Sequence, residues 1–401
     1  MSDQLENLIQ TDDQCCIHNY GRLPIAFSRG EGARLWDIDG KEYLDFLGGI
    51  AVVLLGHSHP KITEAVSRQA QTLIHTANVF YIEPQVQLAQ RLSELSGGMR
   101  ALFCNSGTEA NEAAIKLARK YQSKFDTEKF EIISVTDSFH GRTYGALAAT
   151  AQPKYHEGFG PMPEGFRYVE RGNIDALKAA ISDKTAAVIL EPIQGESGVW
   201  PLSDEYLQAA RQLCNQHKSL LVFDEIQSGM GRSGKFFAHE WSGVKADIIS
   251  LAKGLANGVP IGAVLATEDV AKAFVPGSHG CTFGGNFLSC AAALATLDVL
   301  RDENLMENAT KVGGYFVDQL NQWNNQSNAL TEVRGRGLIV GVTLAKPIAR
   351  KVLLAALEEG LVLNAVGDSY LRFLPPLTIT IADVDLAMGK LKIAFAKASA
   401  A

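Results

Sequence analysis

The sequence predicts an α/β fold in which a large domain with a mostly parallel sheet is joined to a smaller α+β domain. Between about residues 60 and 300, short apolar segments that suit buried strands alternate with helical segments, which is typical of parallel sheets. The flanking segments differ in pattern, and 401 residues with 46% hydrophobic content can form more than one core. We therefore expect a large domain at 56–300 and a small domain made from both termini, 1–55 and 301–401.

The individual elements follow from local patterns. Residues 34–46 surround the dipeptide Asp39-Gly40, which favours the turn of a β-hairpin. Long helices are expected after Arg301. Short runs of aliphatic and β-branched residues predict large-domain strands at 101–103, 132–135, 187–190, 220–223 and 248–251. Further predicted elements are helices at 61–73, 84–95 and 109–121 and strands at 337–341 and 370–373.

Composition excludes several classes of protein. The net charge is −7 at pH 7 and no basic cluster is dense enough to track a phosphate backbone, so we expect neither nucleic acid nor an anionic membrane as a partner. No apolar run approaches bilayer-spanning length, and the acidic N-terminus lacks the features of a secretory signal. The six cysteines lack metal-ligand spacing, so we expect no metal, reduced thiols and a cytoplasmic location.

Two of the predicted strands lead directly to a charged residue. Asp224 follows the apolar run 220–223, and Lys253 follows the run 248–252. Because parallel strands end at a common ligand crevice, the acid could face a protonated ring nitrogen and the amine could form an imine with the same cofactor. Taken singly, Asp224 also fits an ordinary helix cap and Lys253 an ordinary solvated lysine. The small apolar neighbours of Lys253 favour a desolvated, nucleophilic amine.

A second group of residues is suited to an anion. The strand at 101–103 leads through Gly107 to Thr108 at the start of a helix, where free N–H groups, a hydroxyl and the helix dipole meet. The same pattern fits a capped helix that binds nothing, and taken alone it slightly favours that interpretation. A second small-residue segment, 280–286, contains Thr282 and offers another hydroxyl.

Two arginines occur where a small acidic ligand would need them. Arg142 lies three residues after Phe139, whose ring could stack on a planar ligand, and Arg372 lies in an apolar strand. Each guanidinium suits bidentate binding of a carboxylate. Arg372 is equally suited to a structural ion pair, for which Glu191 and Glu196 are available partners.

Taken together, these segments resemble a known family, the subgroup III (class III) aminotransferases of fold-type I, which use pyridoxal 5′-phosphate. The chain is most similar to the acetylornithine aminotransferases and also resembles the ornithine aminotransferases. The resemblance covers about residues 20–377, and its motifs occur in one order along the chain. They are GEGARLWD at 30–37, GHSHP at 56–60, NSGTEANE at 105–112, FHGRT at 139–143, EPIQGE at 191–196, FDEIQ at 223–227, AKG at 252–254 and RFLPP at 372–376.

The resemblance implies a set of cofactor residues. Lys253 corresponds to the lysine that binds the cofactor aldehyde and later moves a proton, and Asp224 to the carboxylate that pairs with the protonated ring nitrogen. Thr282 corresponds to a residue that reaches the phosphate of the neighbouring subunit, which implies a homodimer with its active sites at the interface. The remaining implied residues are Gly107 and Thr108 at the phosphate, Phe139 on the ring face and Gln227 at the ring 3-oxygen.

The resemblance also implies how one pocket accepts two unlike substrates. Arg372 would bind the α-carboxylate of glutamate, and Arg142 would bind its side-chain carboxylate. For an ω-amino substrate, Arg142 would bind the α-carboxylate while Glu196 neutralises Arg372, so that no buried arginine is left unpaired. Tyr20 would help to hold the substrate carboxylate.

Two positions depart from the family pattern. Cys281 stands beside the substrate where relatives usually carry Ser or Thr, and Phe287 stands where Pro is common. The expected reaction transfers the ω-amino group of N2-acetyl-L-ornithine to 2-oxoglutarate and gives N-acetyl-L-glutamate 5-semialdehyde and L-glutamate, in arginine biosynthesis. Alternatives are an ornithine, succinylornithine or 4-aminobutyrate aminotransferase, an aminomutase, a cofactor-free Schiff-base aldolase or a non-catalytic α/β binding protein.

Overall fold

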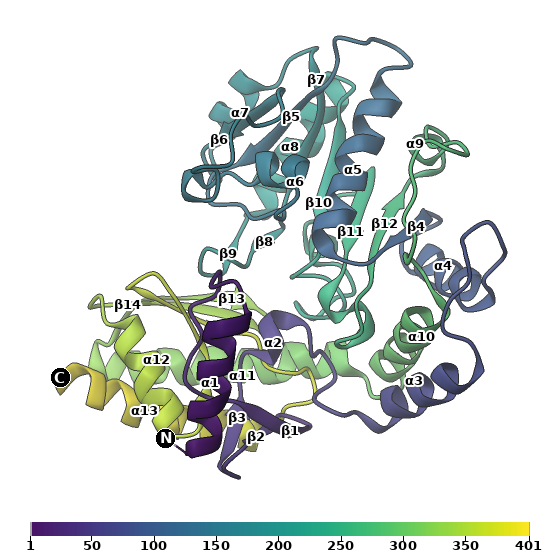
Figure 1. Cartoon of the computed structure of the whole chain (residues 1–401). Coiled ribbons are helices and arrows are strands. Elements are labelled where there is room, and N and C mark those ends of the chain that lie inside the picture. Colours follow the sequence, from purple (N-terminus) through teal and green to yellow (C-terminus); the bar gives the residue numbers. More distant parts are fainter. Residues whose placement is uncertain (1, 401) are drawn as a thin grey trace.

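The computed structural model describes residues 2–400, which form two regions (Figure 1). The upper region in Figure 1 surrounds a seven-stranded sheet, and the lower region contains two four-stranded sheets together with both ends of the described chain. We propose that these regions correspond to the two domains expected at 56–300 and at 1–55 with 301–401.

The central sheet contains the strands β4 (Arg100–Cys104), β5 (Glu131–Val135), β6 (Phe166–Val169), β7 (Thr185–Leu190), β10 (Leu220–Asp224), β11 (Ile248–Leu251) and β12 (Gly262–Ala266). Their order is β4-β12-β11-β10-β7-β5-β6. Neighbouring strands are parallel except at β12, which is antiparallel to both β11 and β4. The predicted α/β class with a mostly parallel sheet is therefore confirmed, and the carboxyl ends of the other six strands share one edge.

All five strands predicted in this sheet are present within two residues of their expected bounds. Strands β6 and β12 were missing from the sequence prediction. In β12 the residues Gly262, Ala263 and Ala266 are too small to give a strand signal. The structure shows why position 262 is small, since a Cβ atom there would lie 2.4 Å from the Ser106 carbonyl oxygen.

Helices cover the faces of the central sheet (Figure 1). Helix α5 (Gly107–Gln122) packs on β11 and β12 through fully buried residues such as Ala110, Ala114 and Ala118. The predicted helices 61–73, 84–95 and 109–121 correspond to α3, α4 and α5. The other elements here are α3 (Pro60–Thr72), α4 (Glu83–Leu95), α6 (Tyr144–Ala149), η1 (Pro153–Tyr155), α7 (Ile174–Ala180), α8 (Asp204–Gln216), η2 (Ala238–Ser242), η3 (Lys253–Ala256), α9 (Glu268–Ala271) and α10 (Phe287–Asp302).

The lower region combines segments from both ends of the chain. Its N-terminal elements are α1 (Asp3–Cys15), β1 (Phe27–Glu31), β2 (Arg34–Asp37), β3 (Glu42–Asp45) and α2 (Gly48–Ala51). Strands β2 and β3 form the predicted antiparallel hairpin. Strand β15 (Leu361–Val362), from the other end of the chain, pairs in parallel with β3, so one sheet is shared by the two ends.

A second sheet in this region has the order β13-β14-β17-β16. The strand predicted at 370–373 is confirmed as β17, but the one predicted at 337–341 is shifted to β14. Gly337, with φ of +60°, instead forms the turn that joins β13 to β14. The elements are α11 (Leu305–Ser327), β13 (Leu330–Arg336), β14 (Ile339–Leu344), α12 (Ala349–Glu358), β16 (Asn364–Val366), β17 (Tyr370–Phe373) and α13 (Ile381–Ala400), and a separate hairpin is formed by β8 (Ile193–Gln194) and β9 (Trp200–Pro201).

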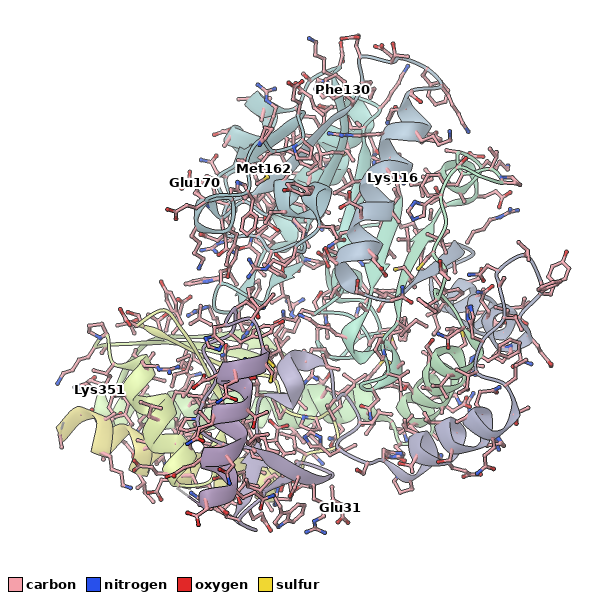
Figure 2. All side chains as sticks on the ribbon, in the orientation of Figure 1. Glu31, Lys116, Phe130, Met162, Glu170 and Lys351 are labelled. Carbon is pink, nitrogen blue, oxygen red and sulfur yellow. The ribbon has the colours of Figure 1, made fainter. Side chains whose placement is uncertain are left out.

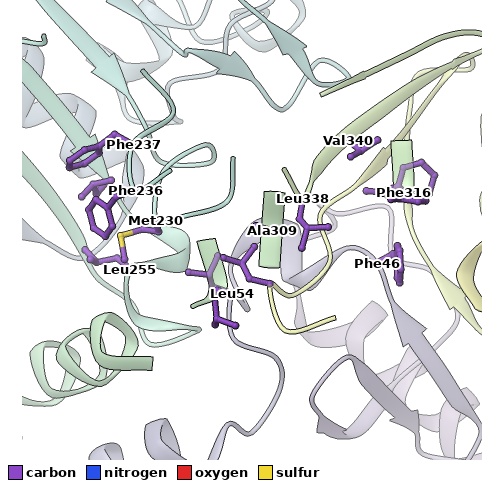
Figure 3. Close-up of a cluster of buried hydrophobic side chains, with 14 of the residues drawn as sticks. Phe46, Leu54, Met230, Phe236, Phe237, Leu255, Ala309, Phe316, Leu338 and Val340 are labelled. Carbon is purple, nitrogen blue, oxygen red and sulfur yellow. The ribbon is translucent and has the colours of Figure 1, made fainter. Parts of the chain in front are cut away.

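A continuous cluster of buried apolar side chains joins the two regions (Figure 3). Phe237 and Leu255 belong to the upper region, whereas Phe316 and Val340 belong to the lower one. Leu54 lies between these groups and is 1% exposed. Close packing of this many apolar side chains favours one fixed position of the two regions relative to each other. Side chains from both regions can therefore form one well-defined site.

The exterior is polar in character. Figure 2 shows the charged side chains of Glu170, Lys351 and Glu31 on the outside of the two regions, and all three are exposed. Within residues 2–400, no helix combines the length and the apolarity needed to cross a bilayer. The same residues contain no group of three or more His, Cys, Asp or Glu side chains arranged to hold a metal ion, and the six cysteines are free thiols.

Candidate active site

A cavity of about 380 Å³ opens at the carboxyl edge of the central sheet. Most of the residues that line it lie at the ends of β4, β5, β7, β10 and β11, which share this edge because the strands are parallel to one another. Seven of the residues singled out from the sequence are thereby brought together. They are Gly107, Thr108, Phe139, Arg142, Asp224, Gln227 and Lys253.

Asp224 is held in one orientation at the end of β10. Its side chain is buried, and its Oδ2 atom accepts hydrogen bonds from Asn111 Nδ2 at 2.6 Å and from His140 Nδ1 at 2.8 Å. Asn111 is fixed in turn, since its Oδ1 atom accepts a hydrogen bond from Ser250 Oγ at 2.6 Å. Removing the carboxylate would leave two buried donors unpaired, which makes Asp224 the centre of a rigid polar network.

Lys253 provides an amine at the same edge. It is the first residue of η3, and its φ of +47° is unusual for a residue with a side chain. Burial, together with the charge of the nearby Arg372, lowers the pKa of this amine to about 8, against the raising effect of neighbouring carboxylates. The desolvated amine expected from the apolar sequence around Lys253 is therefore present, and it lines the cavity.

The N-terminus of α5 lies at the same cavity. Ser106 caps this helix, its Oγ atom accepting a hydrogen bond from Glu109 N at 3.3 Å. The hydroxyl of Thr108 accepts hydrogen bonds from the backbone N–H groups of Arg142 at 2.9 Å and Thr143 at 3.0 Å. The helix cap therefore leaves room for the expected anion site, because Gly107 and Thr108 in the first turn line the cavity.

Glu191 is a cavity residue whose role sequence reasoning missed. It was considered only as a possible partner of Arg372, but its carboxylate accepts hydrogen bonds from Phe139 N at 2.9 Å and Gly195 N at 3.4 Å. Burial raises its pKa to about 7, against the lowering effect of the nearby His140. Its position directly after a buried strand was the available signal. Glu191 thus ties the Phe139 segment to the segment that carries Glu196.

Arg372 pairs with Glu196, the other candidate partner. The arginine is 2% exposed, and its Nη1 atom donates to Glu196 Oε2 at 3.0 Å, to Gly195 O at 2.9 Å and to Gln227 Oε1 at 3.2 Å. Burial alone would raise the pKa of Glu196, but the charge and hydrogen bond of Arg372 hold it below its ordinary value. Because Gln227 lines the cavity, this ion pair lies beside it.

Arg142 presents an accessible guanidinium on another side of the cavity. Its central carbon lies 4.1 Å from the ring centroid of Tyr155 and 5.4 Å from that of Phe139. These aromatic contacts hold the side chain while leaving it exposed to solvent. A ligand carboxylate can therefore approach Arg142 without first displacing a protein carboxylate.

Five predicted residues do not line the cavity within this chain: Glu196 and Arg372 form the ion pair beside it, and the other three are Tyr20, Cys281 and Thr282. Tyr20 is 69% exposed and lies near Arg22 in a hollow beside α1. Cys281 is separated from the cavity by Asn105, whose Nδ2 atom lies 3.1 Å from Cys281 Sγ. Thr282 is exposed on the same loop. The structure thus assembles the expected cofactor residues apart from Thr282, and it places Tyr20 elsewhere.

Comparison with known families agrees with this geometry. The family model "Aminotransferase class-III" matches residues 16–395, and the chain belongs to this family. It is therefore a transaminase, an enzyme that acts on amino acids and keto acids.

Three similar proteins extend this finding over nearly the whole chain. Acetylornithine aminotransferase from Methanocaldococcus jannaschii is 49% identical over 97% of this chain and 98% of its own. A structure of ornithine aminotransferase from Toxoplasma gondii, described with partial occupancy of PLP at its active site, is 35% identical with a TM-score of 0.95 and covers 99% of this chain and 95% of that one. Acetylornithine aminotransferase from Elizabethkingia anophelis is 34% identical with a TM-score of 0.88, over 98% and 99% of the two chains.

Proposed function

We propose that this transaminase transfers the ω-amino group of N2-acetyl-L-ornithine to 2-oxoglutarate and forms N-acetyl-L-glutamate 5-semialdehyde and L-glutamate, a step of arginine biosynthesis. The similarity to proteins named acetylornithine aminotransferase supports this substrate. The observation that carries the proposal is the ion pair between the buried Arg372 and the partly exposed Glu196 beside the cavity, in contrast to an accessible Arg142. Arg142 is always open to a carboxylate, whereas Arg372 becomes open only when Glu196 leaves it. This arrangement suits a pair of substrates that differ in their number of carboxylates.

The donor set of the cavity fits pyridoxal 5′-phosphate, which we propose as the cofactor. When bound, this cofactor supplies a conjugated ring that takes up the electron pair released at the amine-bearing carbon of the substrate. Asp224 would keep the ring nitrogen protonated, which requires the buried and fixed carboxylate that the network around it provides. The other residues that would hold the cofactor are Gly107 and Thr108 at its phosphate, Phe139 at its ring face, Gln227 at its 3-oxygen and Lys253 at its aldehyde.

Lys253 has two tasks in this proposal. Since its pKa is lowered to about 8, a larger share of the amine is neutral near pH 7.5 than for an exposed lysine, and the neutral Nζ atom is the nucleophile. With the substrate amine in place of Lys253 at the cofactor, the same Nζ atom would accept the proton from the amine-bearing carbon of the substrate and would deliver it to the former aldehyde carbon of the cofactor. Both tasks need the amine inside the cavity, where Lys253 lies.

The two arginines and Glu196 would sort the substrates. For glutamate, the α-carboxylate displaces Glu196 from Arg372, and Arg142 takes the side-chain carboxylate. For acetylornithine, Arg142 takes the α-carboxylate and Glu196 stays on Arg372. Arg372 remains paired in both cases, which avoids the cost of about 3–5 kcal/mol that follows when a buried ion pair loses one partner.

We further propose a homodimer with its active sites at the interface. Val79, Phe80 and Tyr81 are 83%, 67% and 97% exposed, and they adjoin Phe283, which is 59% exposed. Asn78 Nδ2 joins this loop to the segment around Thr282 through hydrogen bonds of 3.0 Å to the carbonyl oxygens of residues 281 and 284. Such an apolar face suits a second copy of the chain, and Thr282 at its edge, outside its own cavity, suits the partner's site. A monomer by sedimentation would contradict this.

A panel of amine donors tests the proposed reaction. The protein as purified with cofactor should absorb in the visible range, and this absorbance should be lost fastest with acetylornithine among acetylornithine, succinylornithine, ornithine and 4-aminobutyrate. Borohydride reduction followed by peptide mapping should place the cofactor on Lys253. Faster loss with ornithine would favour the ornithine aminotransferase alternative, which the Toxoplasma similarity also supports. Label on another residue would overturn the site.

A further inference from the structure

The loop between β8 and β9 carries Glu196 and lies against the sheet of the lower region. Figure 1 shows this hairpin reaching from the upper region toward β13, and β9 contacts β13 directly. In the sheet, Gly341 of β14 stands opposite Arg334 on one side and opposite Arg372 on the other. Because residues that stand opposite one another in a sheet share a face, the two arginines flank Gly341 on one face.

The loop is seated between these two arginines. Arg372 Nη1 donates to the Gly195 carbonyl oxygen at 2.9 Å, and Arg334 Nη2 donates to the Gly198 carbonyl oxygen at 2.7 Å. A Cβ atom at Gly341 would lie 2.4 Å from the Gly198 carbonyl oxygen and 2.8 Å from Val199 Cβ, so the loop fills the space that this glycine leaves. One arginine thus holds each end of the segment that presents Glu196.

Arg334 is itself firmly held. It is 8% exposed, and its Nη1 atom donates to Thr343 Oγ1 at 2.6 Å and to Glu332 Oε2 at 3.2 Å. Its guanidinium carbon lies 3.6 Å from the ring centroid of Trp200, at the far end of the loop. The Trp200 Nε1 atom donates back to the Ser197 carbonyl oxygen at 3.0 Å, which closes the loop on itself. Arg334 therefore contacts the loop through both its backbone and its aromatic residue.

The loop depends on such support because part of it is strained. Val199 is fully buried and has a φ of +62°, a conformation that β-branched residues strongly disfavour. A residue in that conformation persists only where its surroundings hold it. Arg334 donates a hydrogen bond to the carbonyl oxygen of the preceding residue, Gly198. The loss of Arg334 would therefore release the segment next to Glu196.

We propose that Arg334 is a positioning residue for substrate selection, which keeps Glu196 directed at Arg372 by clamping the far end of the loop. The proposal rests on the exchange of Glu196 for a substrate carboxylate proposed above. Without the clamp, Glu196 would leave Arg372 more often, and a dicarboxylate would then find Arg372 free in a larger fraction of molecules. When an ω-amino substrate with a single carboxylate binds, Arg372 would then more often lack a carboxylate partner.

Glutarate, a dicarboxylate with no amino or keto group, probes this exchange without turnover. Calorimetric titration of the cofactor-loaded protein should give a dissociation constant about fivefold lower for Arg334→Gln than for the wild type. Glu196→Ala should lower it at least as much. In the double variant the Arg334 change should add nothing, because no Glu196 is left to position. Arg336→Gln, on the same strand but in contact with Trp241, is the matched control and should bind glutarate as the wild type does.

The four variants, each compared with the wild type, distinguish the ways in which the proposal could fail. Tighter binding in Glu196→Ala but not in Arg334→Gln would overturn the role of Arg334 and keep the exchange. Unchanged binding in Glu196→Ala would overturn the exchange itself. An equal effect of Arg334→Gln with and without Glu196 would mean that Arg334 acts elsewhere, which also overturns the proposal. If Arg334→Gln does not fold, Arg334→Lys decides, since it keeps the charge but not the planar fork and should shift binding in the same direction.

Discussion

The cofactor side and the substrate side of the cavity are built in opposite ways. Asp224 receives hydrogen bonds from Asn111 and His140, and all three belong to the upper region. The ion pair of Arg372 with Glu196 instead joins a strand of the lower region to a loop of the upper one. In the proposed function, the chemistry common to both substrates therefore rests on a fixed network, and the selection between substrates rests on a single ion pair.

The exposures of Asp224 and Glu196 fit the roles proposed for them, one carboxylate that stays in place and one that exchanges with substrate. Asp224 is 4% exposed, and its departure would strand two buried donors at a cost of about 1–3 kcal/mol each. The side chain of Glu196 is 31% exposed, so water can solvate it as soon as a ligand replaces it. The difference teaches that a buried cation can serve two substrates when its protein partner lies at the edge of solvent.

The largest expected effect on kcat/KM comes from changing Lys253, on the cofactor side of the cavity. Lys253→Ala should lower kcat/KM by at least about 10³-fold, because the amine that moves the proton is absent. Lys253→Arg should be equally impaired, since it keeps the charge but offers no comparable nucleophile. Steady-state assays with acetylornithine and 2-oxoglutarate measure both. Activity within tenfold of the wild type in either variant would contradict the role of Lys253.

The Asp224 network predicts the next effect. Asp224→Asn should lower kcat/KM by about 10²-fold, because a neutral amide cannot hold a proton on the ring nitrogen as a carboxylate does. Asp247→Asn is a matched control just before β11, at the opposite end of that strand from the cavity, where the carboxylate pairs with Arg211, and it should leave kcat/KM close to that of the wild type. Equal losses in the two variants would indicate a structural effect alone.

The pKa of Lys253 predicts a pH dependence for the cofactor-free chain. Only the neutral amine reacts with an aldehyde, so the rate of cofactor capture should rise with pH and level off above about 8, where burial places the pKa. Below that value the rate should fall about tenfold per pH unit. Stopped-flow absorbance measures the profile. A midpoint near 10.5, the ordinary value for lysine, would mean that the amine is solvated.

The sequence predicted the parts of the fold and the site that depend on local patterns. The apolar runs before Asp224 and Lys253 located two strands and the edge where they end, and parallel topology brought the residues together. It missed β12, which begins with Gly262, a position that is kept small by a close approach to Ser106 rather than by strand propensity. Contacts between distant segments have no local signal.

The absence of a local signal for contacts between distant segments also explains which features of the site the sequence did not predict. The carboxylate of Glu191 binds two backbone N–H groups, one of them 52 residues earlier in the chain, and no pattern near Glu191 indicates this. The hydrogen bond from Arg334 to Gly198 spans 136 residues. In both cases the partner is a backbone atom, which carries no residue-type signal. Motifs located the arginines and acids, and the family resemblance implied the pairing of Glu196 with Arg372, which the structure shows directly.

The contrast between the two sides is tested most directly by half-reaction rates of Glu196→Ala. Rapid-mixing measurements with acetylornithine and with glutamate should show a loss about tenfold greater for acetylornithine, because Arg372 is then uncovered only when the single-carboxylate substrate binds. Glu205→Ala, an exposed position on α8, is the control. Equal losses with the two substrates would contradict the account of an exchangeable substrate side.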